Sequence, residues 1–277
     1  MMQMLFTKMH GLGNDFMVVD GGGYDLPDAA TIRWLGDRRT GIGFDQLLWL
    51  EPPRSKDADV FYRIFNADGA EVEQCGNGAR CIARFLAGHV AGTQQREFRL
   101  QHATGISRAT LEADGNVTVE LGVPNFDPAS LPFVADNEQS SYAVEVGGES
   151  IELRIVSVGN PHAVIEVDTV EDAPVERLGP LLECHDRFPN RANIGFMQVV
   201  AADHIRLRVF ERGVGETRAC GTGACAAMVV GRSAGRLADD VVVELPGGSV
   251  RVRWEGPGAT VKLTGEAVTV FEGTIDV

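Results

Sequence analysis

Short runs that alternate between apolar and polar residues dominate this chain of 277 residues. The clearest runs are 108–122 (RATLEADGNVTVELG), 142–159 (YAVEVGGESIELRIVSVG) and 241–265 (VVVELPGGSVRVRWEGPGATVKLTG). A period of two is typical of strands, and the DGN, GG and PGG turns within these runs predict β-hairpins. The pattern therefore indicates many short strands joined by tight turns.

Helical patterns are fewer. Apolar residues that recur every three to four positions predict helices near 28–38, 76–88, 174–185 and 221–236. Many strands combined with few helices favour the α+β class. The length allows one large domain or two of ordinary size.

The chain contains an internal repeat. Residues 65–81 (FNADGAEVEQCGNGARC) align with 210–226 (FERGVGETRACGTGACA), and six of 17 positions are identical when Cys75 is placed on Cys220. Two shorter matches come in the same order and at nearly the same spacing. They are GNDFMVV (13–19) with GNPHAVI (159–165), and IGFDQLL (42–48) with IGFMQVV (194–200).

Three matches in one order predict that the chain is two copies of one unit. The copies would meet near residues 120–125, where the sequence LGVPN lies. We therefore expect two domains of similar fold.

The net charge of −14 limits the possible partners. A surface this acidic repels phosphate backbones and anionic lipids, so neither a nucleic acid nor a membrane is expected as a partner. The first residues contain no charged stretch followed by a long apolar core, which argues against a signal peptide. Five cysteines in a chain of this size suggest reduced thiols and a cytoplasmic protein.

The repeated cysteines suggest a chemistry. Cys75 and Cys220 each lie where a strand-like run ends and a helix-like run begins, and Gly-X-Gly-Ala follows each of them. The first N–H groups of a helix bind carboxylates and lower the pKa of a nearby thiol. If two such helix ends face each other, one thiolate can remove a proton from a carbon while the opposite thiol supplies one. The result is inversion at that carbon without a cofactor, with the N–H donors stabilising enolate charge.

Other interpretations of the cysteines remain open. A Cys-Gly-X-Gly turn can be purely structural, because buried cysteine is a common small hydrophobe. A zinc site could combine both motif cysteines with Cys81 and Cys225, but gaps of five and four residues do not suit two short knuckles, so no metal is expected. We expect Cys81 and Cys225 in the core, and Cys184 to be a core or incidental residue.

Amide side chains recur beside the repeat motifs. Each asparagine alone could cap a turn, but the set suggests a ligand with several amine and carboxylate groups. Glu211 and Arg212 could hold the ammonium and carboxylate of an amino acid, or could be a surface ion pair. His162 stands where the first copy has Phe16, which packing alone could explain. The amide residues are Asn14, Gln46, Asn66, Asn160 and Asn193.

Motifs along nearly the whole chain resemble those of the diaminopimelate epimerase family. Ala70 departs from the family pattern, which more often has Ser after Asp-Gly, and Glu266 replaces a Pro that usually follows Thr-Gly. The matching stretches are HGLGNDF (10–16), RTGIGFDQ (39–46), FNADGAEVEQCGNGARC (65–81), GNPH (159–162), ERGVGETRACGTGACA (211–226) and ELPGGSVRVRW (244–254).

The resemblance implies an activity and the residues that carry it. The activity would be interconversion of LL- and meso-diaminopimelate in lysine and peptidoglycan precursor synthesis, without pyridoxal phosphate or another cofactor. Cys75 and Cys220 would be the paired acid and base, and His162 and Glu211 would assist proton transfer. The backbone at Gly76-Asn77 and Gly221-Thr222 would hold the reacting carboxylate. Substrate contacts would come from Asn14, Gln46, Asn66, Asn160, Asn193, Glu211 and Arg212.

The resemblance also implies an architecture of two pseudo-symmetric domains, each a curled, mostly antiparallel sheet around a central helix, with the site in the cleft. The last strand would return to the first domain, which gives domains of 1–121 plus 264–277 and of 122–263. A homodimer would be ordinary. The alternatives are a proline or hydroxyproline racemase of the same fold, a non-catalytic amino-acid-binding protein and a metal-binding structural protein.

Overall fold

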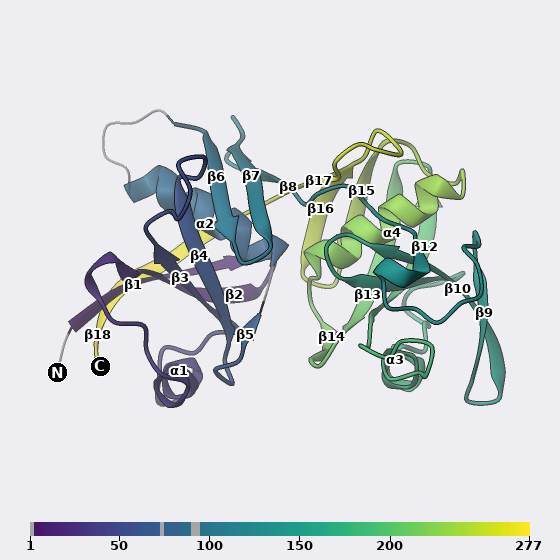
Figure 1. Cartoon of the computed structure of the whole chain (residues 1–277), viewed down its shortest axis with the longest axis horizontal. Helices are drawn as coiled ribbons and strands as arrows, with labels where there is room; N and C mark the ends of the chain where they lie inside the picture. The colour runs from purple at the N-terminus through teal and green to yellow at the C-terminus, as the bar shows by residue number, and fades with distance from the viewer. Residues whose placement is uncertain (1–2, 73–74, 90–94) are drawn as a thin grey trace. The chain divides into compact units, whose positions relative to one another are not determined.

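The computed structural model describes residues 3–72, 75–89 and 95–277, and its mixture of strands and four α-helices confirms the α+β class (Figure 1). The chain divides into two units. Unit 1 consists of Met1–Val119 and Gly265–Val277, and unit 2 is Glu120–Thr264. The last strand therefore belongs to the same unit as the first.

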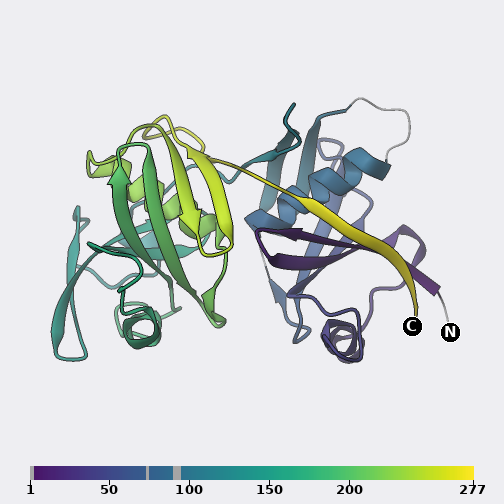
Figure 2. The ribbon, with the colours of Figure 1, turned by 180° about the vertical axis from the view of Figure 1, so that it is seen from behind.

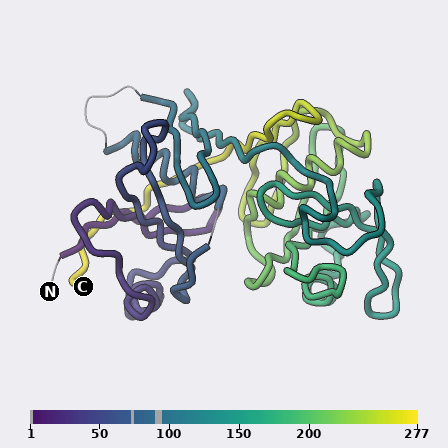
Figure 3. Tube along the Cα trace, in the orientation of Figure 1, coloured from purple at the N-terminus to yellow at the C-terminus, as the bar shows by residue number. Residues whose placement is uncertain are grey.

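Unit 1 is a sheet in the strand order β18-β1-β2-β3-β4-β6-β7-β8. The β2–β3 and β4–β6 pairs are parallel and the others antiparallel, and β5 adds to the far end of β4. β18 runs alongside β1, so the yellow end of the chain lies beside the purple beginning (Figures 2 and 3). The strands are β1 Gln3–Gly11, β2 Asn14–Asp20, β3 Gln46–Glu51, β4 Val60–Asn66, β5 Glu71–Val72, β6 Glu97–His102, β7 Gly105–Leu111, β8 Val117–Glu120 and β18 Val268–Asp276.

Two helices cover the two faces of the unit 1 sheet. Helix α2 (Gly76–His89) packs against β1, β2, β6, β7 and β18, and helix α1 (Ala29–Gly36) packs against β3. In β3, Leu47 and Trp49 join the apolar cluster that contains residues of α1, while a Cβ atom on Gly78 of α2 would lie 3.0 Å from Leu48. The strand is therefore apolar on both faces because it lies between two layers.

Unit 2 repeats this arrangement, with the strand order β9-β10-β11-β12-β13-β15-β16-β17 and β14 added to β13. Its parallel pairs, β11–β12 and β13–β15, correspond to those of unit 1. The strands are β9 Tyr142–Val146, β10 Glu149–Ser157, β11 Pro161–Glu166, β12 Asn193–Ala201, β13 His204–Glu211, β14 Gly215–Thr217, β15 Asp240–Leu245, β16 Gly248–Arg253 and β17 Lys262–Gly265.

The helices of unit 2 correspond to those of unit 1. Helix α4 (Gly221–Ser233) packs against β10 to β13, β15 and β16, and helix α3 (Val175–Glu183) packs against β9 and β12 to β14. Residues from Gly221 to Gly231 are all buried, as expected for a helix that is apolar on every side. Two short 3₁₀ helices, η1 Gly21–Gly23 and η2 Pro128–Ser130, complete the elements.

The elements predicted from periodicity are present. All four helices lie where the apolar pattern places them, and the three alternating runs form the hairpins β7–β8, β9–β10 and β15–β16. In the β9–β10 turn, Gly147 and Gly148 have φ values of 61° and 82°. Glycine reaches this left-handed region without strain, which explains the Gly-Gly turn.

One of the three repeat matches was wrong. In the parallel β2–β3 pair Phe16 faces Gln46, and in the corresponding β11–β12 pair His162 faces Asn193. The strand register therefore equates Gln46 with Asn193 rather than with Gln198. The shared IGF tripeptide is a coincidence, because it precedes β3 in unit 1 but lies inside β12 in unit 2.

Candidate active site

Both motif cysteines sit at the start of a helix. The Gly78 N–H donates to Cys75 Sγ at 3.4 Å, and the Gly223 N–H donates to Cys220 Sγ at 3.3 Å. The first hydrogen bond of each helix also ends on the cysteine carbonyl: the Ala79 N–H donates to Cys75 and the Ala224 N–H donates to Cys220. Each thiol thus occupies the side-chain position of a helix N-cap, directly beside the N–H groups of the first turn. Besides the N–H groups of Gly78 and Gly223, which donate to the thiols, the first turns carry those of Gly76 and Asn77 in α2 and of Gly221 and Thr222 in α4.

In unit 1, amide groups surround Cys75. Asn14 begins β2, and its Oδ1 lies 3.8 Å from Cys75 Sγ. The same oxygen accepts a hydrogen bond of 3.1 Å from Asn77 Nδ2. The structure therefore brings together three of the predicted residues at the beginning of α2.

Gln46 and Asn66 form a second pair in unit 1. They face each other at the ends of β3 and β4, and Gln46 Nε2 donates to Asn66 Oδ1 at 2.9 Å. Gln46 Oε1 is buried and has no hydrogen-bond partner among the described residues. A buried acceptor of this kind costs free energy unless a ligand or water satisfies it, which fits the predicted binding role.

An ionic cluster that the sequence analysis missed orients Asn14. Asn14 Nδ2 donates to Asp45 Oδ2 at 3.0 Å, and Arg38 bridges Asp15 and Asp45 at 2.7 and 2.8 Å. Burial opposes ionisation of Asp15, but hydrogen bonds from Arg38 and Lys8 lower its pKa to about 2. With its amide nitrogen held by Asp45, Asn14 presents its oxygen to Cys75.

Arg80 was also missed, although it lies within the repeat motif. It is fully buried one turn after Asn77 in α2. Its Nη2 donates to Asn77 Oδ1 at 3.0 Å and its Nε donates to the Glu266 carbonyl at 3.2 Å. A Cβ atom on Gly11 would lie 3.1 Å from Nη2, so glycine leaves room for the guanidinium. A buried arginine held in this way ties Asn77 to the returning C-terminal segment of unit 1.

In unit 2, Cys220 is more deeply buried and has an acidic neighbour. Its thiol is hydrogen-bonded to Glu211 and lies 3.6 Å from Thr222 Oγ1. Burial raises the pKa of Cys220 well above its usual value, and the charge of Glu211 raises it further. The lowered thiol pKa expected beside a helix N-terminus is therefore wrong for Cys220, because burial outweighs the N–H groups. Thr217, another residue that the sequence analysis missed, donates its hydroxyl to Glu211 Oε1. The position of Glu211 is occupied in unit 1 by the neutral Asn66.

His162 belongs to a cluster of amide side chains. Its Nε2 lies 3.0 Å from Asn160 Oδ1, and Asn160 Nδ2 in turn donates to Thr222 Oγ1 at 3.3 Å. Asn193 Nδ2 lies 3.5 Å from the same ring nitrogen. Burial, and then the charge of Arg212, lowers the pKa of His162 to about 3, so the ring is neutral near pH 7.

Arg212 follows Glu211 at the end of β13. Its N–H donates to Asn193 Oδ1 at 3.0 Å, and its Nη1 donates to the Asn190 carbonyl at 3.4 Å. The side chain of Arg212 is exposed.

The remaining cysteines lie apart from this chemistry. Cys81 and Cys225 are fully buried, as expected, and burial raises the pKa of Cys81 to about 12. Cys184 is exposed at the end of α3. In the described part of the chain, no group of three or more His, Cys, Asp or Glu residues is arranged to hold a metal ion.

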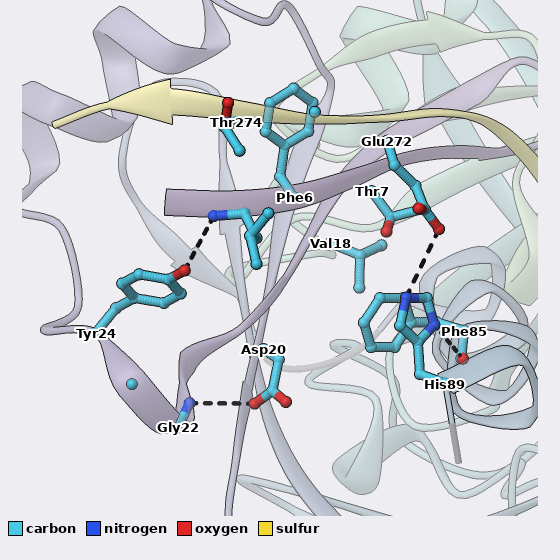
Figure 4. Close-up of a pocket in the computed structure, with 13 residues that line it drawn as sticks. Phe6, Thr7, Val18, Asp20, Gly22, Tyr24, Phe85, His89, Glu272 and Thr274 are labelled. Carbon is cyan, nitrogen blue, oxygen red and sulfur yellow. Dashed lines mark hydrogen bonds and ion pairs between the residues drawn. The ribbon is translucent and has the colours of Figure 1, made fainter. Parts of the chain in front are cut away.

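Unit 1 has a hollow of about 740 Å³, and none of the predicted site residues is among the residues that line it (Figure 4). Phe85 stacks on His89 at its wall, His89 lies 3.7 Å from Glu272, and the Tyr24 hydroxyl accepts a hydrogen bond from the Leu5 N–H. The candidate chemistry is therefore elsewhere, at the beginnings of α2 and α4.

Comparison with known proteins identifies the family of this chain. The family model described as "Diaminopimelate epimerase" matches residues 6–126 and 154–270. The chain belongs to the diaminopimelate epimerase family. A curated diaminopimelate epimerase of Pseudomonas aeruginosa (strain LESB58) is 54% identical over 275 residues, with 99% of each chain covered. One of Stutzerimonas stutzeri (strain A1501) is 53% identical over 277 residues, again with 99% of each covered.

Solved structures share the fold at lower identity. A hydroxyproline epimerase from Agrobacterium vitis superposes with a TM-score of 0.70 and 20% identity, covering 99% of this chain and 92% of that one. At this identity the likeness extends to the fold alone. The described residues include no helix that is both long and apolar enough to cross a membrane.

Proposed function

We propose that the protein is a diaminopimelate epimerase that interconverts the LL and meso isomers by a two-base reaction at the α-carbon. The observation that carries this proposal is the pair of cysteines, each capping a helix in one of two units with the same strand order. Identity of 54% to a curated relative of that name supports the choice of substrate.

The reaction exchanges one proton for another. The thiolate of one cysteine takes the α-proton, so the C–H bond breaks and an S–H bond forms. The thiol of the other cysteine then donates its proton to the opposite face of the carbon and becomes a thiolate. The charge that develops on the substrate carboxylate is stabilised by the first-turn N–H groups of α2 and α4. In the reverse reaction the two cysteines exchange roles.

The two cysteines would be tuned by different neighbours. Buried beside Glu211, Cys220 is kept as a thiol by its raised pKa, which suits a proton donor. Glu211 would accept the thiol proton when Cys220 acts as the base. His162 would assist by holding Asn160, which in turn contacts Thr222 at the first turn of α4.

The amide residues would bind the rest of the substrate. Diaminopimelate carries an amino-acid group at each end, so one end can react while the other is held. Arg212 and Glu211 would pair with a carboxylate and an ammonium group. The unsatisfied oxygen of Gln46 would accept from a substrate N–H. Asn14, Asn66, Asn160 and Asn193 would complete the set of donors and acceptors.

A direct assay tests this proposal. Purified, reduced protein is incubated with LL-diaminopimelate without added cofactor, and the isomers are separated by chiral chromatography. We expect the meso isomer to form until the isomers reach equilibrium. No conversion of diaminopimelate, together with racemisation of L-proline or trans-4-hydroxy-L-proline, would favour the alternative activity of the same fold. Tight binding without conversion would favour an amino-acid-binding protein.

We further propose that the protein is a homodimer. β18 pairs with β1 on one side only among the described strands, and it exposes the apolar side chains of Val270 and Phe271. An open strand edge with exposed apolar groups favours pairing, and two copies can pair symmetrically about a twofold axis. Light scattering after size exclusion should give twice the chain mass of 29.8 kDa. A mass of one chain at micromolar concentration would contradict the dimer.

We also propose a cytoplasmic location. All five cysteines are free thiols, which fits a reducing compartment. Fractionation of cells that express the full chain should recover it with cytoplasmic markers, and recovery in the culture medium or the membrane fraction would contradict this.

A further inference from the structure

Helix α3 ends on a buried carboxylate. Glu183 is the last residue of the helix and is 6% exposed. The C-terminus of a helix carries partial negative charge, so an acidic side chain is unfavourable there. Burial adds a further cost unless hydrogen bonds compensate for it. Helix stability therefore does not explain an acid at this position.

Hydrogen bonding to a turn compensates for the burial of the Glu183 carboxylate. Glu183 Oε1 accepts a hydrogen bond of 2.6 Å from the Gly213 N–H, and Arg191 Nη1 lies 3.5 Å away. Gly213 lies in the turn between β13 and β14, and its φ of 75° is readily reached by glycine. Short bonds to an ionised acceptor are among the stronger hydrogen bonds in proteins. Glu183 thus fixes the backbone of this turn to the end of α3.

This turn carries the candidate binding pair. Glu211 ends β13, and Arg212 immediately precedes the glycine that Glu183 holds. Arg212 and Gly213 are exposed, and Val214, 67% exposed, adds no packing that would fix the turn. Hydrogen bonds join this turn to residues 183–193: Glu183 with the Gly213 N–H, Asn193 with the Arg212 N–H, and Asn190 with the Arg212 side chain.

We propose that Glu183 is a positioning residue for Arg212. By fixing the Gly213 N–H, it restricts the backbone from which the Arg212 guanidinium reaches the substrate carboxylate. The inference rests on the proposed function, in which Arg212 binds the non-reacting part of the substrate. Because that contact is made in the ground state as well as in the transition state, loss of Glu183 should raise KM more than it lowers kcat.

The test compares Glu183→Ala and Glu183→Gln with Glu176→Gln, an exposed acid at the beginning of the same helix. Glu183→Ala removes a charged hydrogen bond, so KM for diaminopimelate should rise about tenfold while kcat stays within about threefold. Glu183→Gln keeps an acceptor and should raise KM less. It should not lower the melting temperature, because it removes a charge that is unfavourable at the helix end. Glu176→Gln should leave KM unchanged.

Hydrogen exchange measured by mass spectrometry provides a readout that does not depend on activity. Peptides that cover residues 209–217 should exchange faster in Glu183→Ala than in the wild type. An active, folded Glu183→Ala with unchanged KM would overturn this inference alone. So would a parallel fall of kcat and melting temperature at constant KM, which indicates a merely structural role. Failure of the wild-type protein to epimerise diaminopimelate would instead overturn the proposed function.

Discussion

At the scale of single residues, the two cysteines do the same structural work in different surroundings. Each caps its helix, but Cys75 is half-buried beside the amide of Asn14, whereas Cys220 is buried beside the carboxylate of Glu211. The motif in the sequence predicts the capping position, because Gly-X-Gly after a strand marks the beginning of a helix. It does not predict the surroundings, because these come from strands that are distant in the sequence.

Replacing either cysteine should abolish turnover while the fold survives. A serine hydroxyl fits the cap but is a far weaker acid than a thiol, so it neither ionises to a base near neutral pH nor readily donates its proton. Cys75→Ser and Cys220→Ser should each lower kcat by a factor of at least about 100. Chiral chromatography measures the rate, and far-ultraviolet circular dichroism measures the fold. The exposed Cys184→Ser serves as the control and should keep the wild-type rate. Substantial turnover in either variant would remove that cysteine from the reaction.

His162 should make stability depend on pH. Its pKa falls from 6.5 to about 3 on folding, so between these values the unfolded chain binds a proton that the folded chain does not. Above pH 6.5 His162 should not affect the free energy of unfolding. Below pH 6.5, and down to about pH 3, it should lower the free energy of unfolding by about 1.4 kcal/mol for each unit of pH. Urea unfolding from pH 7 to pH 4 should give a shallower decline for His162→Gln than for the wild type. Parallel declines would mean that His162 is not buried in its neutral form.

At the scale of the element, the sequence predicts well where periodicity is local. The helix at 76–88 and the Gly-Gly hairpin after Val146 follow from patterns within about 15 residues, and both are present. The match of the two IGF tripeptides failed because identical letters can fall in a loop and in a strand, and only strand pairing distinguishes them. The partner of Arg80 could not be predicted either, because Glu266 is distant in the sequence.

Arg80 should hold the beginning of α2 in place. Arg80→Met fills much of the same space but leaves the Glu266 carbonyl and Asn77 Oδ1 without this donor, so the free energy of unfolding should fall by about 2 kcal/mol. Arg84→Met, on the exposed side of the same helix, should change it by less than about 0.5 kcal/mol. Urea denaturation measures both. Equal stability of the two variants would show that Arg80 does not support this part of unit 1.

At the level of the whole molecule, the chain is a duplicated unit whose two copies differ in the side chains around their cysteines. Both units have the same strand order and the same parallel pairs, while Glu211 and His162 of unit 2 stand where unit 1 has Asn66 and Phe16. The repeated motif in the sequence indicated the duplication. The strand register shows which residues of the two copies correspond, and it supports the substitutions of Asn66 by Glu211 and of Phe16 by His162.

The reaction should need nothing beyond the chain and its substrate. Prolonged dialysis against a chelator removes bound metal, and hydroxylamine removes pyridoxal phosphate. If the thiols carry the chemistry, epimerase activity in the presence of reductant should change less than about twofold after both treatments. The untreated enzyme serves as the control. A loss of activity that added metal or cofactor restores would contradict a reaction carried by protein groups alone.

In the proposed reaction, two thiols remove and replace the α-proton of diaminopimelate. Proton NMR of the LL isomer in deuterated buffer, with reduced protein and no cofactor, follows that proton itself. We predict that the α-proton signal fades as deuterium enters and that the meso isomer appears. Formation of the meso isomer should be abolished in both Cys75→Ser and Cys220→Ser, and exchange at the LL centre should be abolished in the variant that lacks the cysteine facing that proton. An α-proton signal that persists for hours with folded wild-type protein, or exchange that survives in both cysteine variants, would contradict a reaction carried by the two thiols.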